Sequence, residues 1–228
     1  MRASLVLGFA AVALIAACGG GEGGHGGSAS SGAGGATTST TSGATTSDTA
    51  SGTGGSGGSG PTFTADSVKL CELVNAYRQE QGLPAVPLSV ALMTVAADHV
   101  GDMALHPEAA TGTCNLHSWS TGSTVWKGCC FTADFAQAAC MWTKPSEITS
   151  TWGPHAYTAY GYEDAAAGVT DPEAALALWK ADPPHDDVIV NHGIWAQKAP
   201  WPAMGCAMQG GFASLWFGDA ADTQTYVP

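Results

Sequence analysis

Six cysteines after residue 60 place the strongest constraint on how this chain folds. They are Cys71, Cys114, Cys129, Cys130, Cys140 and Cys206. An even set of cysteines in an exported chain favours three disulfide bonds, and sequence alone leaves about 15 pairings open. Zinc is the alternative, but no two of these cysteines have the two-residue spacing of a zinc ribbon. Adjacent Cys129 and Cys130 cannot easily bond to each other, so we expect them to join different partners around the 114–140 loop.

The start of the chain carries features of an export signal. Residues 1–17 combine Arg2 with an apolar run that is too short to span a bilayer as a helix. The string Ile15–Cys18 resembles a lipoprotein processing box, which implies a signal peptide over residues 1–17 and a lipid on Cys18. A plain secretory signal with an incidental cysteine is the alternative. Because Gly19 is not an inner-membrane retention residue, we expect a lipid anchor in the cell envelope, facing the periplasm or the exterior, on the outer membrane where one exists.

Composition changes sharply at residue 61. Residues 19–60 are Gly, Ser, Thr or Ala at all but three positions, which predicts a disordered linker over residues 18–60 after the lipidated cysteine. One folded domain is expected over residues 61–228. Two of the 19 acidic residues and one of the 7 basic residues precede it, which leaves 17 against 6 and a net charge of −11. Phosphate contact requires Lys and Arg, so this balance argues against nucleic acid as a partner.

Three segments of the domain have the periodicity and end signals of helices. The first extends from about Thr64 to Gln81 and the second from Ser89 to about Leu105. His99 lies on the inward stripe of the second helix, and we interpret it as a hydrogen-bonded packing histidine rather than a ligand. The third helix begins at Asp171, which can cap it, and stops at Pro183 and the proline after it.

The remaining segments predict a sheet and a long insertion. Residues 106–160 have little periodicity and four of the six cysteines, which is typical of a disulfide-held loop insertion. Met204–Gln209 and Phe212–Gly218 are apolar runs separated by two glycines, so we expect a hairpin in an antiparallel sheet. A further apolar run, Val188–Ile194, precedes them. Gly161–Asp164 has the composition of a bend.

Acids and histidines gather around the third helix. Asp182 and His185 stand at its end, Glu163 lies before it, and His117 comes from a loop-like context far earlier in the chain. Two imidazoles with one or two carboxylates form a ligand set that suits zinc and leaves positions open for water. A hydrogen-bonded structural network without metal is the alternative for the same residues.

The order of these elements resembles the CAP superfamily, the SCP-like domains related to cysteine-rich secretory proteins, venom antigen 5 and plant pathogenesis-related protein 1. The resemblance covers nearly all of residues 63–218. It rests on the opening helix and Gly-Leu-Pro bend of Leu73–Pro84, the second helix ending at Ala97–Ala104, the histidine of His117–Ser118, the Gly161–Asp164 motif, and the helix, tryptophan and histidine of Asp171–His185.

The resemblance implies an α+β fold, a three-layer α-β-α sandwich with the disulfide-held insertion, and a cleft with two histidines and two acids. Carried onto this chain, that tetrad is His117, Glu163, Asp182 and His185, and some family members bind zinc or another divalent cation there. Asp164 replaces the asparagine of the bacterial motif, and Asp186 replaces an arginine. Extra carboxylates would strengthen the attraction of a cation or draw protons onto the histidines instead.

Three functions agree with these observations. The first is a lipid-anchored extracytoplasmic binding or interaction module, held to the membrane by its lipid and taking a cell-surface glycan, lipid or protein. The second is a zinc-dependent, peptidase-like hydrolase with Glu163 as base. The third is a structural surface protein with a vestigial cleft. We favour the first, because the chain offers an anchor, a linker and disulfides but no strong nucleophile, and a fold does not imply chemistry.

Overall fold

A three-stranded antiparallel sheet forms the centre of the domain. The computed structural model describes residues 61–228, so the predicted signal peptide, Cys18 and the linker lie outside the described residues. The strand order is β1–β3–β2, with β1 at Gly161–Ala167, β2 at Ala203–Gln209 and β3 at Phe212–Gly218. β2 and β3 form the predicted hairpin, and Gly210 and Gly211 turn between them with positive φ angles of 60° and 84°.

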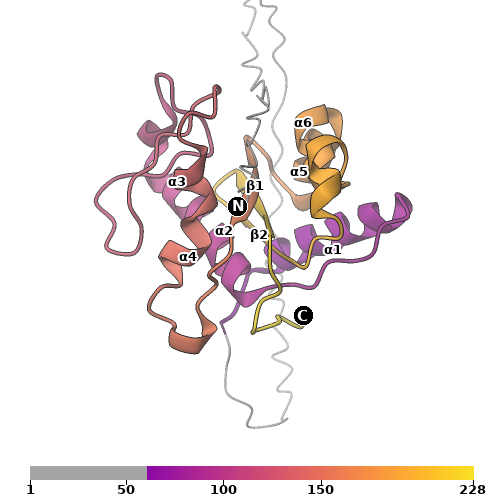
Figure 1. Cartoon of the computed structure of the whole chain (residues 1–228). Helices are drawn as coiled ribbons and strands as arrows, with labels where there is room; N and C mark the ends of the chain where they lie inside the picture. The colour runs from indigo at the N-terminus through magenta and orange to yellow at the C-terminus, as the bar shows by residue number, and fades with distance from the viewer. Residues whose placement is uncertain (1–60) are drawn as a thin grey trace, which may run out of the picture. The chain divides into compact units, whose positions relative to one another are not determined.

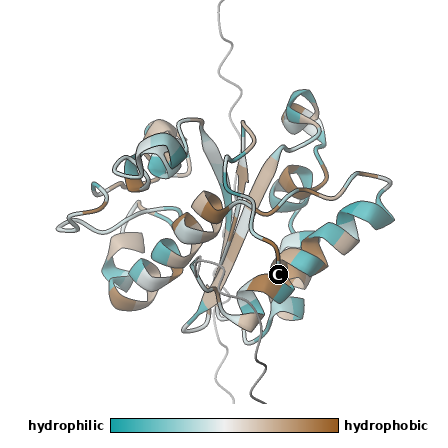
Figure 2. Ribbon diagram, turned by 90° about the horizontal axis from the view of Figure 1, so that it is seen from below, coloured by the Kyte–Doolittle hydropathy of each residue, from teal (hydrophilic) through white to brown (hydrophobic). Residues whose placement is uncertain are grey.

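Helices cover both faces of the sheet, as Figures 1 and 2 show. This arrangement confirms the predicted three-layer α-β-α sandwich. On one face lie α1 (Ala65–Glu80), α5 (Pro172–Ala181) and α6 (Pro183–Ile189); on the other lie α2 (Val90–Leu105), α3 (Ala138–Trp142) and α4 (Lys144–Ile148). Three short 3₁₀ helices complete the list: η1 (Pro107–Ala110), η2 (Gly153–His155) and η3 (Gly193–Lys198).

Side-chain caps set the starts of the three predicted helices. Thr64 accepts a hydrogen bond from the amide of Ser67 at 3.2 Å. Ser89 and Asp171 do the same for α2 and α5, at 3.0 and 2.7 Å. These caps satisfy amide groups that have no partner inside the helix, so the local sequence alone predicts where each helix begins.

Each face of the sheet has its own apolar core. Leu70 and Val74 of α1 and Trp179 of α5 are fully buried against one face. On the other face, α2 lies directly against β2 at Gly205, where an added Cβ would stand 2.2 Å from the backbone of Leu92. Only a glycine permits this close approach, which fixes the depth at which α2 presents its side chains to the sheet.

The segment Gly161–Asp164 differs from its predicted structure. Gly161–Asp164, predicted as a bend, begins strand β1, because it pairs with β3 over the full register from Gly161 opposite Gly218 to Ala167 opposite Phe212. The apolar run Val188–Ile194 forms no strand: its first residues end α6, and η3 begins within it. Pro183 ends α5 as predicted but also occupies the first position of α6, where proline is well tolerated.

Three disulfide bonds confirm the predicted use of the six cysteines. Cys71–Cys206 joins α1 to β2, while Cys114–Cys130 and Cys129–Cys140 hold the insertion. The adjacent pair Cys129 and Cys130 bonds to different partners, as expected. Within residues 61–228, no helix combines the length and apolar character needed to cross a bilayer.

Candidate functional site

Glu163 of β1 is the centre of a buried cluster of histidines and acids. Its side chain lies on the face of the sheet that α2 covers, and none of it is exposed. Ser214 Oγ of β3 donates to Oε1 at 2.5 Å, and His117 Nδ1 lies 3.0 Å from Oε2. His99 Nδ1 makes a further close contact with Oε1. Three donors therefore share one carboxylate. The histidine–acid cluster comprises His99, His117, Glu163, Asp182 and His185.

His99 is held as a cation inside the domain. Its Nδ1 faces the Glu163 carboxylate, and its Nε2 lies 3.0 Å from the carbonyl oxygen of Ser118. Because both neighbours accept hydrogen bonds, both ring nitrogens must carry protons. Burial alone would lower the pKa of His99, but the charge of Glu163 and the hydrogen bonds to Glu163 and Ser118 together outweigh burial and raise it. Trp119 stacks on the ring with centroids 4.2 Å apart, a favourable contact for an imidazolium.

The same contacts keep Glu163 ionised. Burial raises the pKa of this carboxyl, but the charge of His99 and the hydrogen bonds from His117 and His99 together lower it to about 2. The prediction that His99 is a hydrogen-bonded packing histidine agrees with its position. The sequence did not show that its partner is Glu163, 64 residues further along the chain.

The insertion positions His117. Backbone bridges pair Cys114 with Thr132 and Trp119 with Cys129, so the segment between them forms a narrow loop. The amide of His117 donates to Asn115 Oδ1 at 3.1 Å, and the imidazole packs edge-on against Phe131. The disulfide-held loop thus places His117 beside the carboxylate of Glu163 in the sheet.

The second predicted pair forms at the junction of α5 and α6. Asp182 occupies the N-cap position of α6 without a side-chain capping hydrogen bond, and its Oδ2 lies 2.9 Å from Nδ1 of His185 in the first turn. Burial, and then the proximity of the His117 imidazole, lower the pKa of His185, which favours its neutral form. The rings of His117 and His185 lie 6.5 Å apart between centroids and are inclined by 38°. The four predicted residues therefore meet as two histidine–carboxylate pairs.

The arrangement differs from a preformed metal centre. Among residues 61–228, no group of three or more His, Cys, Asp or Glu side chains is disposed to hold a metal ion. Glu163 already accepts three hydrogen bonds, and each Nδ1 of His117 and His185 faces a carboxylate. The nitrogens without a hydrogen-bond partner in the described structure are the Nε2 atoms of these two histidines. Two cavities, of about 650 and 440 Å³, lie elsewhere and contain none of the four residues in their walls.

Asp164 lies on the opposite face of the sheet from its neighbour Glu163. It is 1% exposed, and its Oδ2 is buried without a hydrogen-bond partner in the described structure. Burial first, and then the nearby carboxylates of Glu163 and Asp182, raise the pKa of Asp164 well above its ordinary value. Asp186 contributes in the same direction, while it accepts a hydrogen bond from Tyr77 at 2.8 Å.

His99 of the cluster, and Ser214 beside it, are the two partners of Glu163 that the sequence interpretation did not assign to the site. Ser214 is a lone polar residue in the apolar strand β3, and it accepts a hydrogen bond from Trp216 Nε1 at 2.9 Å while donating to Glu163. A polar residue on an inward strand position is a usable signal, because such a group needs a buried partner.

Comparison with known proteins places this fold in a family. Residues 71–211 match the model of the CAP family, described as the cysteine-rich secretory protein family. This match covers more than half of the chain. The chain therefore belongs to the CAP family, as its helices, motifs and disulfides predicted. A comparison with curated proteins gave no match.

Solved structures of CAP proteins are distant relatives. A cysteine-rich secretory protein from Staphylococcus aureus is 13% identical with a TM-score of 0.42, covering 68% of this chain and 38% of its own. An extracellular protein containing a SCP domain from Bacillus anthracis is 17% identical with a TM-score of 0.45, covering 70% and 45%. An outer surface protein from Borrelia burgdorferi is 13% identical with a TM-score of 0.42, covering 67% and 91%. The chain thus spans less than half the length of the first two.

Proposed function

We propose that this protein is a lipid-anchored, extracytoplasmic binding module, and that His117 and His185 hold a divalent cation in it. Three disulfides support a location outside the cytoplasm, because such bonds persist in oxidising compartments. The similar proteins from Bacillus anthracis and Borrelia burgdorferi carry the names extracellular and outer surface protein. The lipoprotein processing box at Ile15–Cys18 supports the anchor.

The observation that carries the cation proposal is the pairing of each histidine with its own carboxylate. Glu163 lies 3.0 Å from Nδ1 of His117, and Asp182 lies 2.9 Å from Nδ1 of His185. A carboxylate on Nδ1 fixes the tautomer that leaves the Nε2 lone pair free, and metal-binding histidines are commonly oriented in this way. The acids would therefore orient the two ligands rather than act as ligands themselves.

The two imidazole nitrogens are suitable ligands for a cation, but the distance between the two rings is larger than in a bound state. Two imidazoles that share one zinc ion at 2.0–2.1 Å in a tetrahedral arrangement have ring centres about 5 Å apart. The rings of His117 and His185 are 6.5 Å apart, so they must approach each other on binding. His117 lies in a loop and His185 in the first turn of α6. Small movements of the backbone cost less free energy at such positions than in the middle of a helix or strand. A bound cation would supply a Lewis-acidic centre with open positions for a ligand.

Zinc titration of the full chain with intact disulfides tests this proposal. We expect one zinc ion per chain, lost in both His117→Ala and His185→Ala. His155→Ala is the matched control, because His155 is exposed in η2, and it should leave zinc binding unchanged. Circular dichroism of each variant separates loss of the site from loss of the fold.

Absence of stoichiometric zinc binding by the folded wild-type chain would refute the cation proposal. Retention of binding in both histidine variants would refute it as well. Binding must also weaken as pH falls, because protons compete for the same Nε2 atoms.

No observation favours the hydrolase alternative. A general base needs a carboxylate oxygen within reach of the proton it removes. Both oxygens of Glu163 are engaged, Oε1 by His99 and Ser214 and Oε2 by His117. The binding module is therefore the function that the geometry supports best.

A further inference from the structure

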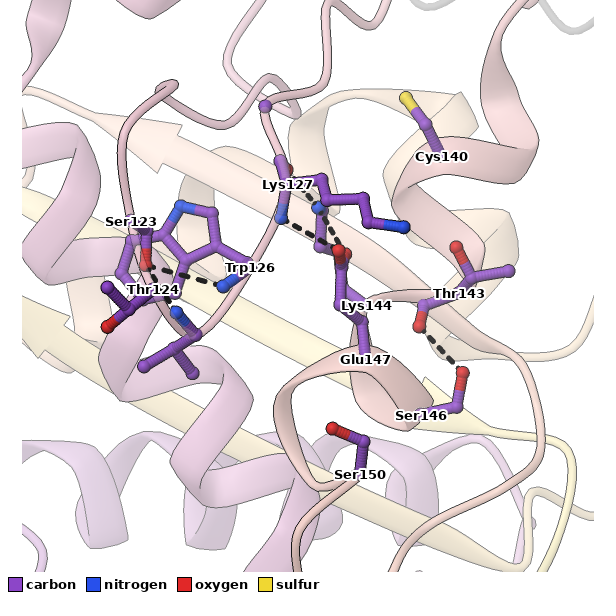
Figure 3. A pocket seen from close by; sticks show the side chains of 12 residues that line it. Ser123, Thr124, Trp126, Lys127, Cys140, Thr143, Lys144, Ser146, Glu147 and Ser150 are labelled. Carbon is purple, nitrogen blue, oxygen red and sulfur yellow. Dashed lines mark hydrogen bonds and ion pairs between the residues drawn. The ribbon is translucent and has the colours of Figure 1, made fainter.

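The larger of the two cavities described above lies in the insertion, apart from the histidine–acid cluster. It has a volume of about 650 Å³, within the range of small-molecule sites. Figure 3 shows its walls, which come from the segment 123–128 on one side and from α3 and α4 on the other. The lining residues include Ser123, Trp126, Lys127, Thr143, Ser146 and Glu147.

The wall formed by segment 123–128 is fixed in place. Glu147 of α4 accepts the backbone amide of Lys127 through Oε1 at 2.7 Å and Lys144 Nζ through Oε2 at 2.6 Å. Lys144 Nζ also donates to the carbonyl of Lys127. The disulfide Cys129–Cys140 joins the two sides directly behind this contact. A cavity whose walls are already tied together loses little conformational entropy when it takes a ligand.

The hydroxyl groups of the cavity offer both donors and acceptors. Thr143 and Ser146 donate their protons to the backbone carbonyls of Ala139 and Thr143, which leaves oxygen lone pairs free to accept. Ser123 has the opposite role. Its oxygen accepts hydrogen bonds from the backbone amides of Val125 and Trp126, and its proton stays free to donate. A ligand rich in hydroxyl groups can use both kinds of partner at once, since each of its hydroxyls donates and accepts.

Trp126 adds an aromatic surface to the cavity. Its ring packs edge-on against Trp119, with centroids 5.2 Å apart, and lines the cavity. The indole Nε1 is buried and has no hydrogen-bond partner in the described structure. Because this nitrogen is buried, the part of the indole that a ligand in the cavity can contact is the ring. An indole also offers an apolar face to the C–H groups of a sugar ring.

The charged side chains of the cavity indicate which polyhydroxylated ligands it would prefer. Lys144 and Glu147 neutralise each other. Lys127 is exposed and forms no ion pair with any residue of the described domain. On a domain with a net charge of −11, this ammonium group is a local positive charge at the cavity wall. Ammonium groups bind carboxylates through charge-assisted hydrogen bonds.

We propose that this cavity binds an acidic saccharide, with its hydroxyls on Ser123, Thr143 and Ser146, a ring on Trp126 and its carboxylate on Lys127. The site is independent of the proposed cation site, because the two share no residue. The two sites can also be distinguished by experiment, because variants at His117 and His185 should leave saccharide binding unchanged.

Titration calorimetry of the full chain with three probes tests the proposal. Trigalacturonate carries hydroxyls and carboxylates, maltotriose carries hydroxyls alone, and triglutamate carries carboxylates alone. We expect trigalacturonate to bind about tenfold more tightly than either of the others, because only it uses both features.

Variants of the two key side chains complete the experiment. Lys127→Gln should reduce trigalacturonate affinity by about tenfold, to the level of maltotriose. Lys69→Gln, an exposed lysine of α1, is the matched control and should have no effect. Trp126→Phe keeps an aromatic ring but reduces the apolar face that a sugar ring can cover, so we expect an intermediate loss of about fivefold. Near-ultraviolet circular dichroism verifies that each variant is folded.

Three results would overturn the proposal. The first is no binding of trigalacturonate by the folded wild-type chain. The second is equal binding of triglutamate, which would mean that a carboxylate alone is recognised. The third is binding that Lys127→Gln and Trp126→Phe both leave unchanged, which would place the saccharide elsewhere on the molecule. Zinc binding should be the same in these variants as in the wild type, so failure here and failure of the cation proposal are distinguishable.

Discussion

Glu163 and Asp164 are neighbours in β1, and the two faces of the sheet treat them in opposite ways. Both side chains are buried. Glu163 faces α2 and the insertion, where three donors surround it and lower its pKa to about 2. Asp164 faces the other side, where its Oδ2 has no hydrogen-bond partner among residues 61–228 and burial raises its pKa well above the ordinary value. Burial alone therefore does not decide the charge of a carboxyl; the donors around it do.

The contrast also sets two opposite dependences of stability on pH. Glu163 has a lowered pKa in the folded state, so its contribution is complete above an unfolded pKa of about 4.3 and is lost as pH falls toward about 2. Asp164 has a raised pKa, so its contribution is complete below an unfolded pKa of about 3.9 and is lost as pH rises toward the folded pKa.

The largest expected effect comes from Glu163→Ala. The change leaves the His99 cation unpaired inside the domain, so we expect the free energy of unfolding at pH 7 to fall by about 3–5 kcal/mol. Urea unfolding with intact disulfides measures it. Glu173→Ala in the exposed first turn of α5 is the control, with an expected loss of about 1 kcal/mol or less. Equal losses of unfolding free energy in the two variants would show that the buried pair of Glu163 and His99 does not stabilise the domain more than an exposed glutamate does.

Asp164→Asn should act in the opposite direction. The variant cannot ionise, so it avoids the cost of a buried carboxylate, and we expect it to exceed the wild type in unfolding free energy by about 2 kcal/mol at pH 8. Near pH 3.5 the difference should vanish, because the aspartic acid is then protonated in the folded and the unfolded states alike. A series of urea midpoints between pH 3.5 and 8 measures this slope. A constant difference across the series would contradict the titration of Asp164.

Ser214→Ala should have the smallest effect of the three. It removes one of three donors to Glu163 and leaves Trp216 Nε1 without its acceptor. We expect a loss of about 1 kcal/mol in unfolding free energy at pH 7. Because the carboxylate keeps its two histidines, the acid midpoint of unfolding should rise only slightly. A loss as large as that of Glu163→Ala would mean that Ser214, and not His99, is the main partner of the carboxylate.

Local signals in the sequence predicted much of the fold. The caps at Thr64, Ser89 and Asp171 depend on contacts within three residues, and the hairpin depends on two adjacent glycines. Strand β1 was missed because its first residues are polar or small and its partner β3 lies about 50 residues away. Its burial comes from the layers packed on both sides, which no local pattern reports.

The sequence motifs selected four residues that lie near one another in the structure, but they did not predict which of them are in contact. The motifs identified His117, Glu163, Asp182 and His185, and the structure brings each histidine to one acid. Sequence spacing could not show that His99 also pairs with Glu163, because that contact depends on how closely α2 approaches β2 at Gly205. Nor could it show that Asp164 and Glu163 fall on opposite faces before β1 was recognised as a strand.

The disulfide between Cys71 and Cys206 also determines how the domain bears a mechanical load. A pull on the chain ahead of Ala65 can peel away only the residues that precede Cys71. The force then passes through two sulfur atoms into β2 and bypasses the intervening chain, because the two cysteines are 135 positions apart in the sequence. Because β2 is hydrogen-bonded to β3 along its length, the sheet carries the applied force rather than the first helix. Such a domain can be tethered at its N-terminus and resist shear without unravelling from that end.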